Sequence, residues 1–255
     1  MKYIPIEFGD DIMEIKIAPI SDLHVGSPDF DEKLANKFLK DLYNQGAYFI
    51  LLGDLMNANI KNSKGDTYSE ILNPQQQLDA LVSLFGEYKD RILGIVSGNH
   101  ELRIEKEVGV DIMSVFSQLI GKQDVYDRDV IFLNIRFGKL YMNNKKASYH
   151  ILALHGWTNA RTVGGKFNPL YSLRNIALAD CYILAHTHFQ GVFKDGYVLP
   201  EPKNKKTLEI EQIFVNSGSF QRWASYVQRT GKTIPVLGSP ILFLRGDIKN
   251  VRVLI

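Results

Sequence analysis

Two histidines one residue apart, His186 and His188, follow an apolar run at Cys181–Ala185, although the chain has only six histidines. The same arrangement recurs at four other places, where a short apolar run ends and an aspartate or histidine follows soon after. The polar residues at the five run ends are Asp22 and His24, Asp54, Asn99 and His100, His155, and His186 and His188. Carboxylates, imidazoles and an amide oxygen suit divalent metals such as manganese, iron, zinc or nickel. Their number exceeds the needs of one ion and fits two ions about 3.5–4 Å apart that share a carboxylate.

Each of these pieces alone has an ordinary structural interpretation. Asp22-x-His24 would on its own describe a turn with a surface histidine, and Gly53-Asp54 is a common pair. The pieces favour a metal site only together, because each one follows a separate apolar run. The remaining histidine, His150, lies inside a strand signal and is interpreted as an ordinary strand residue.

The runs that carry these residues predict alternating strands and helices in the first half of the chain. The expected strands are Glu14–Ile20, Tyr48–Leu52 and Ile92–Val96. A helix is expected over Asp31–Gln45, with Gly46 after it, and a second helix begins at Asn73-Pro74, where Asn73 is the cap. This order is typical of parallel strands with right-handed crossovers. Ligands bind outside the carboxyl ends of such strands, so the polar residues there are expected to converge.

The second half predicts strands that are joined mostly by turns, which indicates mixed or antiparallel pairing. The expected strands are Val130–Phe137, Ser148–Leu154, Cys181–Ala185, Gly191–Val198, Leu208–Asn216, Ile241–Leu244 and Val251–Ile255. A helix is expected over Pro169–Ala177 and an exposed loop over residues 200–206. No segment of the sequence clearly separates two domains, so we expect a single domain over residues 1–255, with a second sheet packed on the first.

Composition narrows the class of protein. The chain has 255 residues, is 45% apolar and carries a formal net charge of +2, so overall charge selects no partner. A single cysteine, Cys181, excludes an internal disulfide, lies within an apolar run and fits a reducing compartment. The N-terminus lacks the apolar core of a signal peptide, and no apolar run approaches the length of a membrane span. We therefore expect a cytoplasmic protein with no membrane segment.

The motifs in their order along the chain resemble those of a known family. Asp22-x-His24, Gly53-Asp54, Gly98-Asn99-His100-Glu101, His155 and His186-x-His188 resemble the five motifs of the calcineurin-like metallophosphoesterases, over about residues 14–190. The resemblance implies an α/β (α+β) fold, a four-layer α/β/β/α sandwich of two mixed sheets. It also implies a ligand set: Asp22, His24 and His188 for the first metal, Asp54 as the bridge, and Asn99, His155 and His186 for the second.

The resemblance implies a metal-dependent phosphoric ester hydrolase with two divalent ions, manganese first and iron, zinc or nickel as alternatives. Two such ions neutralise phosphate charge and lower the pKa of a bridging water, so that a metal-bridging hydroxide attacks phosphorus. The expected catalytic residues are Asp54, which holds the ions, and His100, which lies outside the ligand set. His100 either donates a proton to the leaving oxygen or stabilises the transition state.

Residues beside the motifs are candidates for substrate contacts. The expected substrate-binding residues are Asn99, Arg103 and Arg161, while Asn57 and Asn59 lie within reach after Asp54. For Arg103, Arg161 and the two asparagines, the alternative is a solvated surface side chain. Trp157 in the Gly156–Gly165 segment either stacks on a base or packs on the core.

The substrate class is predicted from what surrounds the motifs. The related protein phosphatases carry an arginine soon after the second motif, but the residues after Asp54 read Leu-Met-Asn-Ala-Asn. The C-terminal pattern from Val215 to Pro240 is similar to that of phage, prophage and some archaeal metallophosphoesterases, which would place the protein in a host cytoplasm. Basic and aromatic residues interleave there and suit nucleic acid, at Arg222, Trp223, Tyr226, Arg229 and Lys232. Alternatively, Phe220, Trp223 and Tyr226 are core residues of a short helix.

Three functions follow from these observations. The first is a phosphodiesterase that hydrolyses DNA, RNA or a nucleotide. The second is a phosphomonoesterase that acts on nucleotides or other small phosphates. The third is a non-catalytic scaffold, which the complete set of expected ligands disfavours.

Overall fold

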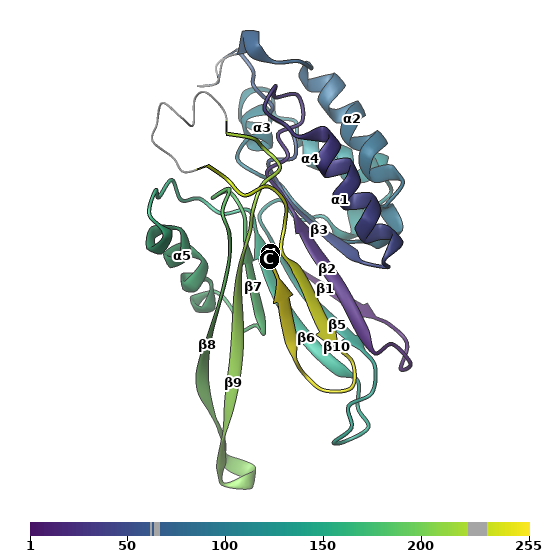
Figure 1. Ribbon diagram of the computed structural model, residues 1–255, viewed down its shortest axis with the longest axis vertical. Helices are drawn as coiled ribbons and strands as arrows, with labels where there is room; N and C mark the ends of the chain where they lie inside the picture. Colours follow the sequence, from purple (N-terminus) through teal and green to yellow (C-terminus); the bar gives the residue numbers. More distant parts are fainter. Residues whose placement is uncertain (62, 64–66, 224–233) are drawn as a thin grey trace.

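A five-stranded mixed sheet carries the first half of the sequence (Figure 1). The computed structural model describes residues 1–61, 63, 67–223 and 234–255. The strand order is β11 (Val251–Leu254), β10 (Ile241–Arg245), β2 (Glu14–Ile20), β3 (Tyr48–Leu52) and β4 (Ile92–Val96). β2, β3 and β4 pair in parallel, as predicted, while β10 pairs antiparallel to β2 and β11. The chain end therefore returns to complete the first sheet.

A six-stranded mixed sheet faces the first. Its order is β1 (Lys2–Glu7), β5 (Val130–Phe137), β6 (Ala147–Leu154), β7 (Cys181–Leu184), β9 (Lys206–Ser217) and β8 (Gln190–Glu201). β6, β7 and β9 run parallel, whereas β5 pairs antiparallel to β6 and β8 antiparallel to β9. The mixed pairing predicted for the second half is confirmed.

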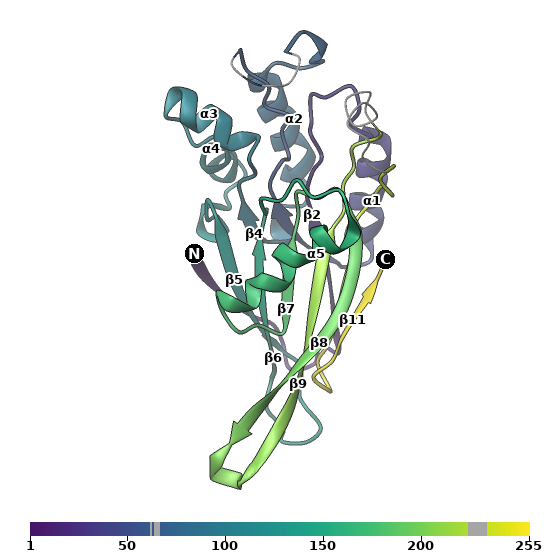
Figure 2. The ribbon, with the colours of Figure 1, turned by 90° about the vertical axis from the view of Figure 1, so that its left-hand side faces the viewer.

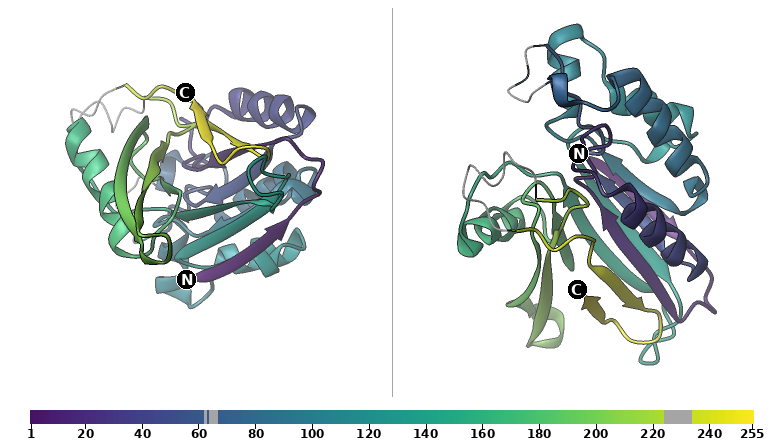
Figure 3. Two further views of the ribbon diagram at one scale, coloured as in Figure 1. Left: turned by 90° about the horizontal axis from the view of Figure 1, so that it is seen from below. Right: turned by 45° about the horizontal axis from the view of Figure 1, so that its top comes forward.

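Helices cover the outer faces of both sheets, on opposite sides of the molecule (Figure 3). The first sheet is covered by α1 (Glu32–Asn44), α2 (Pro74–Gly86), α3 (Glu101–Val108) and α4 (Ile112–Leu119), and the second by α5 (Val163–Ser172). Short 3₁₀ helices lie at Thr67–Ser69, Lys89–Arg91, Gln123–Val125, Leu173–Asn175 and Pro202–Asn204. The predicted four-layer α/β/β/α sandwich is therefore confirmed.

The core fills the space between the sheets and continues beneath the helices. A Cβ added at Gly94 of β4 would collide with Ile131 of β5, so the two sheets touch there. α1 and α2 bury apolar residues against the same core, and their first turns are closed by the side chains of Asp31 and Asn73. A separate apolar cluster joins α5 to the outer face of the second sheet, at Leu170. Packing on both faces fixes the strands that carry the candidate site.

Some elements differ from the sequence-based expectation. β1, α3 and α4 were not predicted, and the helix expected at Pro169–Ala177 instead begins at Val163. It begins there because the Thr162 side chain accepts a hydrogen bond from the Gly165 amide, which leaves Pro169 inside the helix. The predicted loop at residues 200–206 is exposed but shorter, since β8 extends to Glu201 and β9 starts at Lys206. The other predicted strands are confirmed, with bounds that shift by a few residues at most.

The β8–β9 hairpin extends beyond the sandwich as a two-stranded ribbon (Figures 1 and 2). Its partner β7 pairs only with the part of β9 from Ile213 to Asn216, so the distal half of the hairpin has no third strand among the described residues. None of the described helices has the length and apolar composition to cross a membrane. The single domain over the whole chain stays a prediction.

Candidate metal centre

The loops after five strands bring the predicted ligands together. Three of these strands, β2, β3 and β4, belong to the first sheet, and the other two, β6 and β7, belong to the second. The ligands follow within a few residues of each strand end, at Asp22 and His24, Asp54, Asn99, His155, and His186 and His188. The carboxyl ends of parallel strands meet at one edge of a sheet, which is why separate segments of sequence converge here.

A first cluster contains Asp22, His24 and His188, whose ligand atoms all lie within 4.8 Å of one another. The Nε2 atom of His188 lies 3.1 Å from Oδ1 of Asp22 and 3.2 Å from Nε2 of His24. Asp22 is fully buried, whereas the His188 side chain is 27% exposed. The cluster therefore opens to solvent on the His188 side.

A second cluster contains Asp54, His155 and His186. The Nε2 atom of His155 lies 3.2 Å from three atoms, which are Oδ2 of Asp54, Oδ1 of Asn99 and Nδ1 of His186. Asp54 also belongs to a third group with His24 and His100, and so connects the two clusters. This is the place that the sequence predicted for a bridging carboxylate.

Hydrogen bonds behind the rings fix which nitrogen of each imidazole faces the centre. His155 Nδ1 lies 2.7 Å from the carbonyl oxygen of Leu52, which can only accept, so this nitrogen carries the proton. His24 Nδ1 in the same way donates to Oδ1 of Asn57 at 3.1 Å. In the neutral ring of His24 this leaves the Nε2 lone pair pointing at the centre, as a metal ligand requires. Burial alone would lower the pKa of His155, but Asp54 raises it to about 10, so its Nε2, which also faces the centre, would release a proton when a cation binds.

The contacts of these donor atoms, considered apart from the sequence motifs, also suit divalent cations. Oδ1 of Asp22 is buried and has no hydrogen-bond partner in the described part of the chain. Two unprotonated ring nitrogens only 3.2 Å apart, such as Nε2 of His24 and of His188, would repel unless a proton or a cation lay between them. A cation in each cluster would satisfy the carboxylate oxygen and the imidazole lone pairs together.

The backbone at the ligands adopts a conformation that most residues avoid. Eight non-glycine residues with positive φ are found in the described ranges, and five are candidate ligands, at Asp22, His24, Asp54, His186 and His188. Their φ values lie between 47° and 67°. Such residues cost about 1–3 kcal/mol each and persist where the surrounding structure holds them. Strain of this kind is concentrated at the candidate centre, as is common at functional sites.

Mutual electrostatics hold the two aspartates ionised. Burial alone would raise the pKa of Asp54, but the charged ring of His155 outweighs it and holds the pKa well below its usual range. Burial likewise opposes ionisation of Asp22, yet His188 and His155 lower its pKa to about 2. For His24, burial is the largest cause and lowers the pKa well below its usual value. The centre thus presents charged carboxylates, with His24 as a neutral imidazole.

Glu101 is a buried carboxylate whose role sequence reasoning missed. Its Oε2 accepts hydrogen bonds from the amides of Gly98 (2.8 Å) and Asp54 (3.0 Å), and its Oε1 accepts one from the amide of Met56 (2.8 Å). Glu101 therefore ties the loop that carries Asp54 to the loop that carries Asn99. Its position directly after His100 in the motif was the available signal.

His100 and Arg103 form a pair beside the centre. The guanidinium can only donate, so its Nη2, 2.9 Å away, makes Nε2 of His100 an acceptor. The other ring nitrogen, Nδ1, donates to the carbonyl oxygen of Asn57 at 2.6 Å. His100 is therefore neutral here, and burial, the largest cause, lowers its pKa. Arg103 Nη1 donates to Oδ1 of Asn59 at 2.9 Å, so both asparagines lie in this region, as predicted.

The other predicted contacts lie farther out or are not described. Arg161 is exposed in the loop between β6 and α5, and Trp157 in the same loop is 55% exposed, which rules out the core interpretation for Trp157. Arg222 is held by Asp31 at 3.0 Å. Phe220 is buried, but the residues from it to Trp223 are not helical. Tyr226, Arg229 and Lys232 lie outside the described residues, as does most of the predicted basic and aromatic segment.

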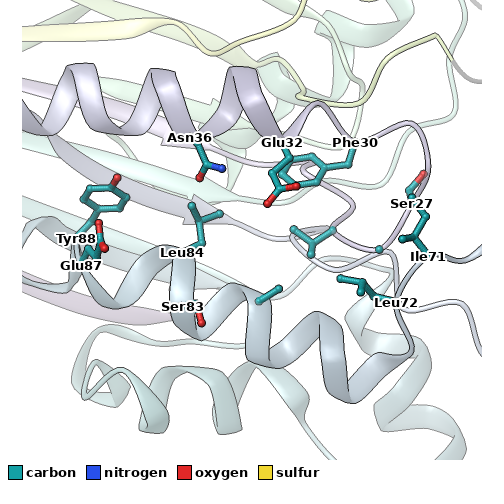
Figure 4. A pocket seen from close by; sticks show the side chains of 13 residues that line it. Ser27, Phe30, Glu32, Asn36, Ile71, Leu72, Ser83, Leu84, Glu87 and Tyr88 are labelled. Carbon is teal, nitrogen blue, oxygen red and sulfur yellow. The ribbon is translucent and has the colours of Figure 1, made fainter.

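A groove of about 400 Å³ lies between α1 and α2, next to the loop that follows His24 (Figure 4). Apolar side chains such as Leu84 line it, with the carboxylates of Glu32 and Glu87 at its sides. It is separate from the candidate centre, since none of the residues that line it is a candidate ligand.

Two mixed sheets between helices, with clustered aspartates and histidines at their strand ends, define the class of metallophosphoesterases. A model of the calcineurin-like phosphoesterase family matches residues 15–212, and the chain belongs to this family. No curated protein matches the chain.

Solved structures with a similar fold share little sequence with this chain. A metallophosphoesterase from Sphaerobacter thermophilus is 13% identical, with 94% of this chain and 87% of that chain covered and a TM-score of 0.43. A predicted phosphoesterase from Streptococcus pneumoniae TIGR4 is also 13% identical, with 95% and 98% covered and a TM-score of 0.35. Wild-type Vps29 complexed with zinc from Entamoeba histolytica is 15% identical, with 94% and 97% covered and a TM-score of 0.36.

Proposed function

We propose that the protein is a phosphodiesterase that uses two divalent ions, manganese first, to hydrolyse nucleic acid or nucleotide phosphodiesters. The observation that carries the proposal is the pair of ligand clusters joined through Asp54, with the His100–Arg103 pair beside them. Two bound ions would supply charge neutralisation at phosphorus and a water that ionises near neutral pH. The protein's side chains would hold the ions, bind the phosphate and contact the leaving group.

The residues divide into three roles in this proposal. Asp22, His24 and His188 would hold one ion, Asn99, His155 and His186 would hold the other, and Asp54 would be shared by both. Arg103 binds a non-bridging phosphate oxygen, for which its guanidinium is suited by geometry. His100 faces the leaving group. Because its Nε2 accepts from Arg103 and carries no proton, this atom could donate to the leaving oxygen only after Arg103 has turned away and the ring has taken up a second proton.

The charge around the centre favours a diester over a monoester. A phosphate monoester carries about −1.5 to −2 charges at pH 7, whereas a diester carries one. The residues from Leu55 to Ile60 after Asp54 include no lysine or arginine and bring two asparagines toward His100 and Arg103 instead. Among the described residues Arg103 is the guanidinium that contacts His100, and a diester with its smaller charge suits this arrangement. A phosphomonoesterase is the alternative.

The loop after His155 supports a nucleic acid or nucleotide as the substrate. It carries an exposed indole at Trp157 and an exposed guanidinium at Arg161, within a few residues of a candidate ligand. An aromatic face for a base and a cation for a phosphate are what such ligands need. A cytoplasmic location is part of the same proposal and rests on the single, buried cysteine.

Hydrolysis of two chromogenic esters tests the proposal. With manganese added, kcat/KM for bis-p-nitrophenyl phosphate should exceed that for p-nitrophenyl phosphate, and a chelator should abolish both activities. A strong preference for the monoester would replace the diesterase with the phosphomonoesterase. Labelled single- and double-stranded DNA and RNA then test whether the substrate is polymeric. Absence of turnover with every phosphoester and divalent metal would favour the scaffold.

A further inference from the structure

Glu70, in the segment before α2, is the shared acceptor in a hydrogen-bonded network next to the candidate centre. Its carboxylate accepts hydrogen bonds from three side-chain amides: Oε1 from Nδ2 of Asn57 at 2.5 Å and of Asn59 at 2.8 Å, and Oε2 from Nε2 of Gln77 at 2.9 Å. The residue lies outside the five motifs and contacts none of the candidate ligands directly. What it does therefore depends on what the three amides hold in turn.

One branch leads from Glu70 to the ligand His24. Asn57 gives its NH₂ group to Glu70, so its amide oxygen must face the other way, toward Nδ1 of His24 at 3.1 Å. An oxygen there can only accept, which places the ring proton on Nδ1 and the lone pair on Nε2. The carboxylate thus selects the amide orientation, and the amide selects the tautomer that can bind a metal.

A second branch leads to the His100–Arg103 pair. Asn59 likewise gives its NH₂ group to Glu70 and turns its oxygen to Nη1 of Arg103 at 2.9 Å. The same guanidinium donates to Nε2 of His100 at 2.9 Å. One carboxylate therefore orients both asparagines, and each asparagine aligns a different group of the proposed active site.

The backbone between the two asparagines is clamped by the same network. Ala58 has a φ of 47°, a left-handed conformation that an alanine rarely adopts. Its amide donates to Oε1 of Gln77 at 2.9 Å, and Gln77 is oriented by its bonds to Glu70 and to the carbonyl oxygen of Leu72. This conformation also presents the carbonyl oxygen of Asn57 to Nδ1 of His100. The strained turn therefore depends on Gln77, which lies outside it and accepts the hydrogen bond of Ala58.

We propose that Glu70 is a positioning residue that fixes the metal-binding tautomer of His24 and aligns the His100–Arg103 pair through Asn57 and Asn59. The inference rests on the proposed function for the meaning of the two branches. Its test is metal binding and ring protonation, neither of which needs turnover. Failure of the proposed substrate would therefore leave the result intact.

The test compares Glu70→Ala with Glu70→Gln in manganese titrations of the full chain. The alanine variant removes the shared acceptor of Asn57 and Asn59, whereas Gln77 keeps the carbonyl oxygen of Leu72. We expect it to bind one of two ions about tenfold more weakly, in the range for outer partners of metal ligands. The glutamine variant keeps one oxygen for both asparagines but turns an NH₂ group toward that of Gln77, so it should weaken binding less than the alanine variant does. Glu87→Ala, at an exposed glutamate of the α1–α2 groove, is the matched control and should bind both ions normally.

Nitrogen NMR of the metal-free protein reads the tautomers directly, and six histidines keep the spectrum simple. We expect the His24 ring to lose its single tautomer in Glu70→Ala, while the signals of the His155 ring, which is held by Leu52 and Asp54, stay unchanged. Normal affinity for both ions together with an unchanged His24 signal would overturn the proposal, and equal weakening of both ions would reduce Glu70 to a structural role. If Glu70→Ala does not fold, Glu70→Asp serves as the test, because its shorter carboxylate does not reach the asparagines. Wild-type affinity for both ions in Glu70→Asp would contradict the proposal.

Discussion

The carboxylate of Asp54 is the residue on which the two ligand clusters depend. Asp54→Asn keeps the shape of the side chain but removes the charge that both ions would share. We expect metal content to fall and the rate to drop by more than about 100-fold, since even outer partners of ligands cost up to that much. Elemental analysis of the purified variant, with the rate per bound metal, checks this. A variant that retains two ions would show that Asp54 does not bridge.

His100 is expected to act on the substrate and not on the ions. His100→Asn should lower kcat by about 100- to 10,000-fold, the usual contribution of a positioned acid or base. Both ions should stay bound, because the ring of His100 is already occupied by Asn57 and Arg103. Loss of an ion in this variant would instead support the third cluster, in which His100 lies with His24 and Asp54.

Residue types at strand ends were enough to predict which side chains gather in the two clusters, because each one follows an apolar run; that they bind metal stays a prediction. Arg103 was predicted from its closeness to the fourth residue of a motif, and it does lie against His100. Glu70 could not be predicted in this way. Its function depends on three amides from two segments that meet only after folding, and no spacing in the sequence records such a meeting.

Among the elements, the two loops after β3 and β4 must pass very close to each other. A Cβ added at Gly98 would collide with the backbone nitrogen and Oδ1 of Asp54. Gly98→Ala should therefore displace the carboxylate, lower the free energy of unfolding by about 1–3 kcal/mol and weaken metal binding. Chemical denaturation and manganese titration measure the two effects.

Gly86 in α2 provides the matched control for that substitution. A Cβ there meets nothing within 4 Å, so Gly86→Ala should be neutral or slightly stabilising and should leave metal binding unchanged. Equal effects at both glycines would show that the close approach of Gly98 to Asp54 does not explain the losses of stability and metal binding.

Asp180, just before β7, couples distant elements through its charge. It accepts a hydrogen bond from the His150 amide at 2.8 Å and pairs with Lys249 at 2.6 Å. Burial would raise its pKa, but His150 and Lys249 together lower it. An acid with a lowered pKa stabilises the fold above its unfolded pKa and loses this effect as pH falls through the folded value.

Asp180→Asn should therefore lower the free energy of unfolding by about 1–2 kcal/mol at pH 7. The difference from wild type should shrink as pH falls below about 4. Denaturation curves across this pH range provide the measurement, with Asp79→Asn at an exposed position of α2 as the control. A difference that does not change with pH would mean that packing, and not charge, explains the loss.

Element boundaries were predictable where apolar periodicity and caps agreed, as at Asn73 before α2. They were missed where the reason lies elsewhere. β1 is recruited by β5 across more than a hundred residues of sequence, and α5 begins at a threonine cap ahead of a proline that suggested a later start. Pairing and capping partners of this kind are visible only in three dimensions.

At the scale of the whole molecule, the candidate ligands come from both sheets. Ions bound there would link the sheets, and by mass action they stabilise only the folded chain. Manganese at about 100 times its Kd should add about 2.7 kcal/mol per ion and raise Tm by about 5–10 °C for each. Thermal denaturation with manganese and with a chelator checks this. An identical Tm in both would indicate that the centre binds no manganese.

Among the described residues, no third strand pairs with either flank of the outer half of the β8–β9 ribbon. Such flanks are templates on which another extended chain can grow a sheet, so an unguarded ribbon invites aggregation. The end of this one is guarded by Pro200 and by exposed lysines at Lys203, Lys205 and Lys206. An added strand would have to line up beside these charges, which disfavours its pairing with the end of the ribbon.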